Sequence, residues 1–334
     1  MKMIVKAAVA LVACLVLGPQ ARAEVKEVRI SKGYGVLYLP LMVMEQRKLL
    51  EKKAAESGLG EVKTSWYLFD GGNVINDAML AGTLDIAGTG APGFITLWSK
   101  SKGTRLEMQG VAGMSGTRLT LNTINPDIKS LKDYTVKDKI ALPGIKTSLA
   151  AVVLHMAAAK ELGKDKYNAL DGSTVGLPHP EAYTALMSGK TEITSHFASP
   201  PYATLELRDK RVHSVVNSID ALGPITLNVV FAPKKFIDDN PKTMAAFLAA
   251  FDEACEIIAK DKEGAARDLQ ASLKAKISME DAMEMVTDKD ASFSATPTGM
   301  MQFANFMADV GSIKNRPEKW SDMYMPALAV RAGN

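Results

Sequence analysis

Histidine and cysteine are the side chains that most often ligate metals or act as bases and nucleophiles, and this chain holds few of them. Its four histidines are His155, His179, His196 and His213, and its two cysteines are Cys14 and Cys255. No two histidines are three or four residues apart, so none can pair on one face of a helix, and no cysteines cluster beside them. The sequence therefore predicts no metal site.

The glycine-rich segments lack the spacing of known catalytic loops. Gly33-Tyr34-Gly35 has neither the third glycine nor the later acid of a dinucleotide site. Gly113 to Gly116 encloses a serine, but Thr117 stands where a nucleophile elbow requires its final glycine. The acidic residues form no recognisable catalytic pair. We therefore predict no catalytic residue and no cofactor, and we favour binding over catalysis.

One segment combines residue types suited to holding an anion. Thr147-Ser148 opens an alanine-rich helix that the sequence predicts over residues 149–162. A helix N-terminus offers unpaired N–H donors and a partial positive charge, and hydroxyls there add hydrogen bonds. Simple helix capping is the competing interpretation, and it is compatible with ligand contact.

These residues need a scaffold, and the hydrophobic pattern predicts one in which strands and helices alternate. Glycine loops separate a strand over 25–30, a helix over 41–56, a strand over 62–69, a helix over 74–80 and a strand over 84–87. The same order returns with a strand over 139–142, helices over 149–162 and 182–187, and a strand over 193–194 that enters a loop over 195–200. This alternation is typical of parallel α/β sheets, and further helices are predicted over 243–259, 279–286 and 299–310.

An internal repeat links the two halves of this pattern. Ala78, Gly82, Asp85, Ile86 and Ala91 recur 107 residues later as Ala185, Gly189, Glu192, Ile193 and Ala198. Both copies read as a helix, a turn, an acid and a short strand leading into a loop. The repeat predicts two similar lobes, each with a loop at the carboxyl end of a strand, where open parallel sheets bind ligands.

The first 23 residues are predicted to be a cleaved secretory signal peptide. Lys2 and Lys6 precede the apolar run from Ala7 to Leu17, and Ala21-Arg22-Ala23 fits the cleavage rule. We expect cleavage after Ala23 and a periplasmic location. Leu11 to Cys14 also matches a lipobox, which would tether the protein to a membrane through Cys14. Free secretion is favoured, because the apolar run continues past Cys14.

Composition excludes several classes of function. The 334 residues are 47% hydrophobic and 23% charged, which suits a folded chain with a large core. Residues 1–23 hold three basic residues and no acid, so the chain after cleavage has 37 basic and 37 acidic residues. A neutral chain gives no electrostatic case for nucleic acid. Cleavage also leaves Cys255 as a lone cysteine within an apolar helical pattern, where an inert thiol is expected.

Five segments stand in a characteristic order and spacing: Ile30 to Gly35 with Leu39-Pro40, Gly71 to Gly90, Ile128 to Ser148, Leu177 to Pro201 and Phe231 to Ala254. In these segments the chain resembles a known family, the periplasmic substrate-binding proteins of ABC importers, in the nitrate/sulfonate/taurine-type (NitT/TauT) group. The resemblance covers most of residues 28–260.

The resemblance implies a two-lobed α/β fold (type II periplasmic-binding-protein fold) with two parallel or mixed sheets joined by hinge crossovers. The first lobe would take 24–116 and 224–334, including a C-terminal helical tail, and the second would take 117–223. The crossovers would lie near Gly113 to Thr117 and Leu222 to Pro224. The lobes would close on a small-molecule ligand between them.

The resemblance also implies that loops at strand ends and helix N-termini contact the ligand. In the first lobe these are Gly33, Tyr34, Gly72, Asn73, Gly90 and Ala91, and in the second they are Thr147, Ser148, Glu181, His196, Phe197 and Ser199. Tyr34 and Asn73 have purely structural alternatives, as a core ring and as the cap of the following helix.

The implied function is capture of a small organic anion, sulfonate or carboxylate, for an inner-membrane permease by a monomeric protein that is not an enzyme. Two alternatives stay open. One is a relative that binds or synthesises a pyrimidine thiamin precursor, and the other is a periplasmic ligand sensor.

Overall fold

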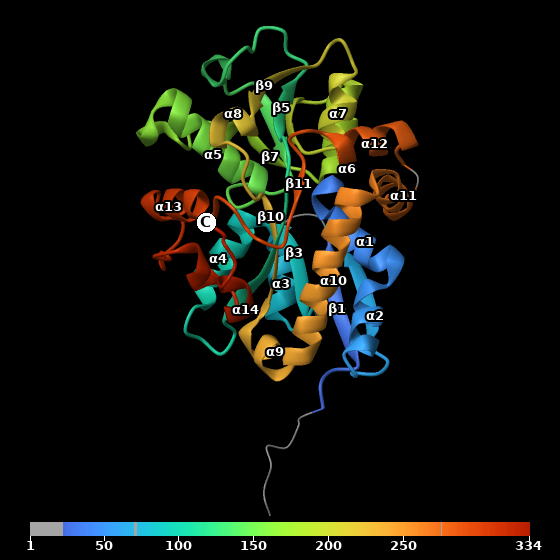
Figure 1. The fold of residues 1–334 in the computed structure, drawn as a ribbon. Coiled ribbons are helices and arrows are strands. Elements are labelled where there is room, and N and C mark those ends of the chain that lie inside the picture. Colours follow the sequence, from blue (N-terminus) through green and yellow to red (C-terminus); the bar gives the residue numbers. More distant parts are fainter. Residues whose placement is uncertain (1–22, 70–71, 275) are drawn as a thin grey trace, which may run out of the picture.

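The computed structural model describes residues 23–69, 72–274 and 276–334, and Figure 1 shows that they form two bodies stacked one above the other. Each body is built on its own sheet. The expected signal peptide, apart from Ala23, lies outside the described residues, as does the lipobox cysteine Cys14.

The first sheet has six strands and lies in the lower half of Figure 1. Its strand order is β11-β4-β10-β3-β1-β2, where β1 pairs in parallel with β2 and β3, and β10 runs antiparallel to β3 and β4. The bounds are β1 Glu27–Lys32, β2 Lys63–Leu68, β3 Ile86–Gly90, β4 Met108–Gly116, β10 Asn228–Pro233 and β11 Ser292–Phe293.

The second sheet has five strands in the order β7-β6-β8-β5-β9. Here β6 pairs in parallel with β7 and β8, and β5 runs antiparallel to β8 and β9. The bounds are β5 Thr120–Thr123, β6 Lys139–Leu142, β7 Thr174–Gly176, β8 Ile193–Ala198 and β9 His213–Asn217.

The two sheets share one topology, as the internal repeat predicted. Strands β2, β1, β3, β10 and β4 correspond in order and direction to β7, β6, β8, β5 and β9. The repeated glycines, Gly82 and Gly189, both adopt positive φ, 68° and 61°, at the turn between a helix and the next strand. Ile86 and Ile193 then begin β3 and β8, the strand of each sheet that has a parallel neighbour on one side and an antiparallel neighbour on the other.

Helices cover both sheets. Those before residue 117 are α1 Leu39–Arg47, α2 Leu49–Glu56, α3 Gly72–Leu80 and α4 Ala91–Ser101. Between the crossovers they are α5 Leu149–Leu162, α6 His179–Ser188, α7 Tyr202–Leu207 and α8 Ser218–Leu222. The C-terminal helices are α9 Lys234–Asp239, α10 Pro241–Lys260, α11 Lys262–Ser272, α12 Met279–Thr287, α13 Met300–Asp309 and α14 Pro326–Ala329.

The C-terminal helices complete the first body. Helix α10 packs against α1 and α2, and α13 packs against α4. Phe94 of α4 anchors this core, since its ring lies 5.6 Å from the rings of both Phe231 and Tyr324 and the side chain is fully buried. Among the described residues, no helix combines the length and apolar character needed to cross a bilayer.

The sequence-based expectation does not include strands β4, β5, β7, β10 and β11, and two of its predicted elements differ from the structure. The single helix predicted over 41–56 is broken at Lys48, which adopts a left-handed conformation with φ 52°. The loop predicted from Ser195 is instead the body of β8, which continues to Ala198. Its polar side chains find partners inside the second body, because Ser195 Oγ donates to Thr123 Oγ1 and accepts from the Tyr134 hydroxyl.

Sheet membership changes twice along the chain. Strand β4 of the first sheet is followed by β5 of the second, and β9 of the second is followed by α8 and then β10 of the first. These changes support the proposed lobe boundaries, 24–116 with 224–334 and 117–223, and we use the word lobe in that sense below.

Candidate functional site

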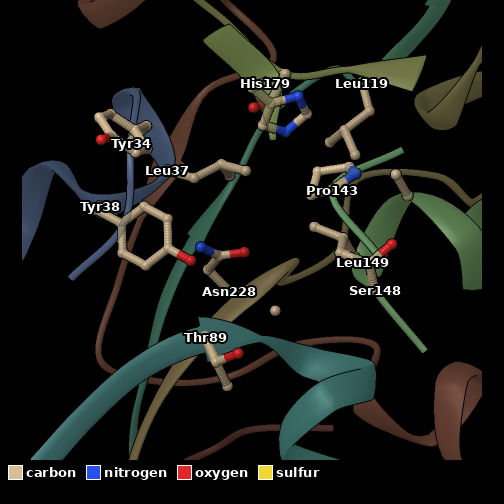
Figure 2. A pocket seen from close by; sticks show the side chains of 13 residues that line it. Tyr34, Leu37, Tyr38, Thr89, Leu119, Pro143, Ser148, Leu149, His179 and Asn228 are labelled. Atoms are coloured by element: carbon tan, nitrogen blue, oxygen red, sulfur yellow. The ribbon is translucent and has the colours of Figure 1, made fainter. Parts of the chain in front are cut away.

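A cavity of about 60 Å³ lies between the two lobes. Figure 2 shows its walls, which come from both sides. The first lobe contributes Tyr34, Leu37, Tyr38, Thr89, Gly90 and Asn228, and the second contributes Leu119, Pro143, Ser148, Leu149, Ala150, His179 and Ser199. A ligand held here would therefore contact both lobes at once.

Three helices begin at this cavity. Helix α4 starts after the N-cap Gly90, α5 starts after the N-cap Ser148, and α6 starts at His179. Ser148 Oγ accepts a hydrogen bond from the N–H of Ala151 at 3.2 Å, and the Ala91 N–H is already used by the Leu227 carbonyl. The positive ends of three helix dipoles thus converge, and such ends favour negative charge.

Asn228 supplies a further donor. Its side chain is 1% exposed, and its Nδ2 has no hydrogen-bond partner among the described residues. Figure 2 shows the amide directed into the space between Tyr38 and Leu149. A buried donor without a partner costs about 1–3 kcal/mol, so the cavity offers an acceptor ligand a position that the protein does not fill.

The described lining residues include no lysine, arginine, aspartate or glutamate. Arg118 pairs instead with Asp288, at 3.1 Å, and Lys146 is exposed. The groups that these described residues can offer to an anion are N–H and O–H dipoles.

A chain of buried polar side chains backs the cavity at His179. Nδ1 of His179 lies 2.8 Å from Nε2 of His196, and Nδ1 of His196 lies 2.6 Å from a carboxylate oxygen of Glu206. Asn122 Nδ2 donates to the other Glu206 oxygen at 2.9 Å. His196, Glu206 and Asn122 are fully buried. Burial lowers the pKa of His179 well below its ordinary value, and the adjacent His196 adds to that shift.

The lobes touch directly beside the cavity. A Cβ placed on Gly90 would lie 2.8 Å from Cβ of Leu149 in the second lobe. A Cβ on Gly35, whose φ is 84°, would lie 2.4 Å from the carbonyl oxygen of Pro200. Any larger residue at Gly90 or Gly35 would push the two lobes apart. The cleft is therefore narrow because both positions are glycine.

Ion pairs add a second set of contacts between the lobes. Arg208 of α7 pairs with Asp281 and, at 3.1 Å, with Glu284, and both acids lie on α12. Arg118 pairs with Asp288 and, at 3.5 Å, with Asp290. These arginines belong to the second lobe and the acids to the first.

The structure brings four of the predicted site residues together at this cavity: Tyr34, Gly90, Ser148 and Ser199. His196 does not line the cavity but lies behind His179, to which it is hydrogen-bonded, and Phe197 is buried in β8. Ala91 is buried at the start of α4, and Gly33 is buried under the ring of Tyr38.

The other predicted residues lie elsewhere or outside the description. Thr147 lines a neighbouring cavity of about 350 Å³ beside α13, and Glu181 is exposed on α6. Gly72 and Asn73 begin α3, and the surroundings of these two residues lie outside the described part of the structure.

Sequence reasoning missed His179 and Asn228 as lining residues. His179 stands between two prolines, and Pro180 at the first turn of α6 is the signal that could have placed it at a helix start. Asn228 begins β10 before an apolar run and carries no comparable signal.

Comparison with solved structures identifies the fold. The alkanesulfonate-binding protein SsuA from Xanthomonas axonopodis pv. citri, bound to MOPS, matches with a TM-score of 0.69 and 16% identity over 88% of this chain and 96% of its own. The periplasmic aliphatic sulphonate binding protein SsuA from Escherichia coli matches with a TM-score of 0.66 and 16% identity, over 91% of this chain and 93% of its own. The periplasmic nitrate-binding protein NrtA from Synechocystis PCC 6803 matches with a TM-score of 0.69 and 15% identity, over 93% of this chain and 86% of its own.

The chain has the periplasmic-binding-protein fold. This confirms the fold class expected from the sequence, two mixed sheets in an α/β protein, and supports the resemblance on which that expectation was based. No profile of a known protein family matches the chain, and no curated protein matches it in sequence.

Within the described part of the chain, no group of three or more His, Cys, Asp or Glu residues could hold a metal ion. Cys255 lies on α10, away from the cavity, and burial raises the pKa of its thiol to about 12. A thiol with so high a pKa is a poor nucleophile near neutral pH.

Proposed function

We propose that this protein is the solute-binding component of an ABC-type importer, and that it holds a small organic anion between its two lobes. The observation that carries the proposal is the convergence of three helix N-termini and the unpartnered amide of Asn228 on one cavity between the lobes. The positive ends of helix dipoles favour negative charge, and the Asn228 amide can donate a hydrogen bond, so an anion suits both features.

The ligand class is a sulfonate or carboxylate. The three proteins of similar fold are named for binding alkanesulfonate, aliphatic sulphonate and nitrate, and all three ligands are oxyanions. At about 60 Å³, the cavity has room for an anionic head group in place of a few waters. An organic tail would extend toward the tyrosines, Tyr34 and Tyr38.

Ligand binding would act by a population shift between open and closed forms. The ligand contacts both lobes only in the closed form, so it stabilises that form by the contacts that the open form lacks. The closed protein, a monomer in the periplasm, would then deliver the ligand to an inner-membrane permease. This role requires tight, reversible binding and no chemical change in the ligand.

The test is to identify what the protein holds. Native mass spectrometry of freshly purified protein lacking residues 1–23 would reveal a co-purified anion by its mass. Thermal unfolding with ethanesulfonate, MOPS, nitrate, acetate and a neutral hydroxymethylpyrimidine would rank the classes, because a ligand that binds only the folded state raises its stability. Stabilisation by the pyrimidine alone, or no compaction in small-angle scattering with a stabilising anion, would refute the proposal.

A further inference from the structure

A larger cavity lies beside helix α13, and the proposed function makes no use of it. We call it the α13 cavity. Its volume is about 350 Å³, whereas the cavity that Asn228 lines measures about 60 Å³. Its walls come from α13 of the first lobe and from α5 and the segment after α5 in the second lobe. Figure 1 shows α13 next to α5 at the level where the two bodies meet.

The wall on the first lobe is apolar. Phe306, Met307 and Val310 supply it from the end of α13, and Val152 of α5 adds an apolar side chain from the second lobe. The Tyr167 ring stands edge-on to the Phe306 ring, with the centroids 6.1 Å apart and the planes at 84°. These side chains suit a flat apolar group, because aromatic rings attract one another in edge-on and offset arrangements.

The volume of the α13 cavity is sufficient for such a group. A cavity of about 150 Å³ can bind benzene, so about 350 Å³ has room for an aromatic group with a substituent. The 60 Å³ cavity does not have that room. The two cavities therefore differ in the size of ligand that each can enclose.

The wall on the second lobe carries charge. Lys146 and Asp171 are the charged residues among the described lining. Asp171 is already held by Nε2 of His155, at 2.6 Å. Lys146 has no hydrogen bond or ion pair with any residue that the structure describes. Its ammonium group is thus available to an anionic group whose apolar part lies against α13.

We propose that the α13 cavity is a second ligand site, that it takes an aromatic anion with its charge at Lys146 and its ring against Phe306, and that its occupation favours the closed form. The ring and the charge would be held by different lobes. Such a ligand makes both contacts only when the lobes are closed, so it stabilises that form.

The two sites are then coupled. An anion in the 60 Å³ cavity also contacts both lobes only in the closed form, so each ligand should raise the affinity of the other by the same factor. This coupling rests on the proposed function. The existence of the second site does not rest on it, because the walls and the charge of the α13 cavity are independent of Asn228 and the helix starts around it.

The probe is naphthalene-2-sulfonate, which joins a flat aromatic group to a permanent negative charge. Calorimetric titration of the protein should show saturable binding of one molecule per chain. Asn228→Asp should leave that affinity within twofold, because Asn228 does not line the α13 cavity. Absence of binding, or a large loss of affinity in Asn228→Asp, would overturn the proposal.

Two variants test the walls of the cavity. Val310 is half-buried at the end of α13, so Val310→Phe can place its ring in the cavity and should weaken naphthalene-2-sulfonate binding at least tenfold. The matched control is Val136→Phe, the same change at a valine that is 83% exposed, and it should bind as wild type does. A Val310→Phe protein that keeps its affinity would overturn the proposal.

Lys146→Asn removes the charge without straining the backbone. Lys146 adopts φ 69°, a left-handed conformation in which asparagine is enriched. Because Lys146 is exposed, we expect a loss of about two- to fivefold that disappears at 1 M NaCl. An unchanged affinity at low salt would overturn the proposal, and this variant gives a result even if Val310→Phe does not fold.

The coupling is measured with ethanesulfonate as the second ligand. Saturating naphthalene-2-sulfonate should raise the affinity for ethanesulfonate about fivefold or more, and the reverse titration should give the same factor. Competition between the two ligands, or independent binding, would overturn the proposal. If ethanesulfonate alone does not bind, the proposed function fails, and the α13 cavity is still judged by Val310→Phe and Lys146→Asn.

Discussion

Gly90 offers the sharpest test that the two lobes close on the ligand. It adopts φ −63° and ψ 141°, an extended conformation open to any residue, so alanine causes no backbone strain there. Its added Cβ would lie 2.8 Å from Cβ of Leu149, which is held by the first turn of α5. Gly90→Ala therefore perturbs closure and leaves the first lobe intact.

The expected magnitude follows from that distance. Carbon atoms in contact lie about 3.5–4.0 Å apart, so the lobes must separate by roughly 1 Å along this line. Overpacking of this kind costs about 1–3 kcal/mol. If this free-energy cost destabilises only the closed form, ligand affinity falls about 5- to 150-fold. The thermal midpoint of the ligand-free protein should hardly change, because the free protein can relieve the contact by opening.

The assay is calorimetric titration of the best-stabilising anion, with small-angle scattering to follow closure. Leu149→Gly removes the clashing Cβ, so the double variant should recover most of the lost affinity. Gly176→Ala is the matched control, since a Cβ there meets nothing within 4 Å. A Gly90→Ala protein that binds as tightly as wild type would refute closure to this contact.

Three further outcomes are expected. Asn228→Asp replaces a buried donor with a negative charge and should weaken anion binding by about 100-fold or more; calorimetry would show it, and retained affinity would remove Asn228 from the site. Arg208→Ala breaks two partly exposed ion pairs between the lobes, so affinity should fall by at most about fivefold, and the difference should vanish at 1 M NaCl; a salt-independent loss would contradict an electrostatic contact. Cys255, whose thiol pKa is raised to about 12, should resist iodoacetamide at pH 8 until the protein unfolds; rapid labelling of the native protein, read by mass spectrometry, would contradict the raised pKa.

Part of the fold could be predicted from local patterns. The strand over 139–142 and the helix over 149–162 were expected with the same bounds that the structure has, because an apolar run, a Pro-Gly turn and a Ser N-cap are all local signals. The repeat around Gly82 and Gly189 predicted two similar lobes for the same reason, since each glycine ends a helix in a left-handed conformation.

The site was harder to predict. Tyr34, Gly90, Ser148 and Ser199 line the cavity, since each follows a strand or begins a helix, and their contact with a ligand stays a prediction. The sequence pattern predicts a loop at Ser195 and His196 of β8, because a run of Thr, Ser and His lacks the alternation of a half-buried strand. In the fold these side chains are buried against polar partners of other elements, which a local pattern cannot reveal.

By itself, the sequence determined part of the secondary structure, including the strand over 139–142 and the helix over 149–162, a repeat that predicts two related lobes, and a helix beginning at Ser148 that offers donors to an anion. Those properties depend on periodicity, capping and turn residues within a few positions of one another. Only the tertiary structure decided that α6, β8 and α7 place His179, His196 and Glu206 in one hydrogen-bonded line, and that Asn228 of the other lobe lines the same cavity as His179. These contacts join side chains from separate elements, so their geometry depends on how the elements pack and not on the order of the residues.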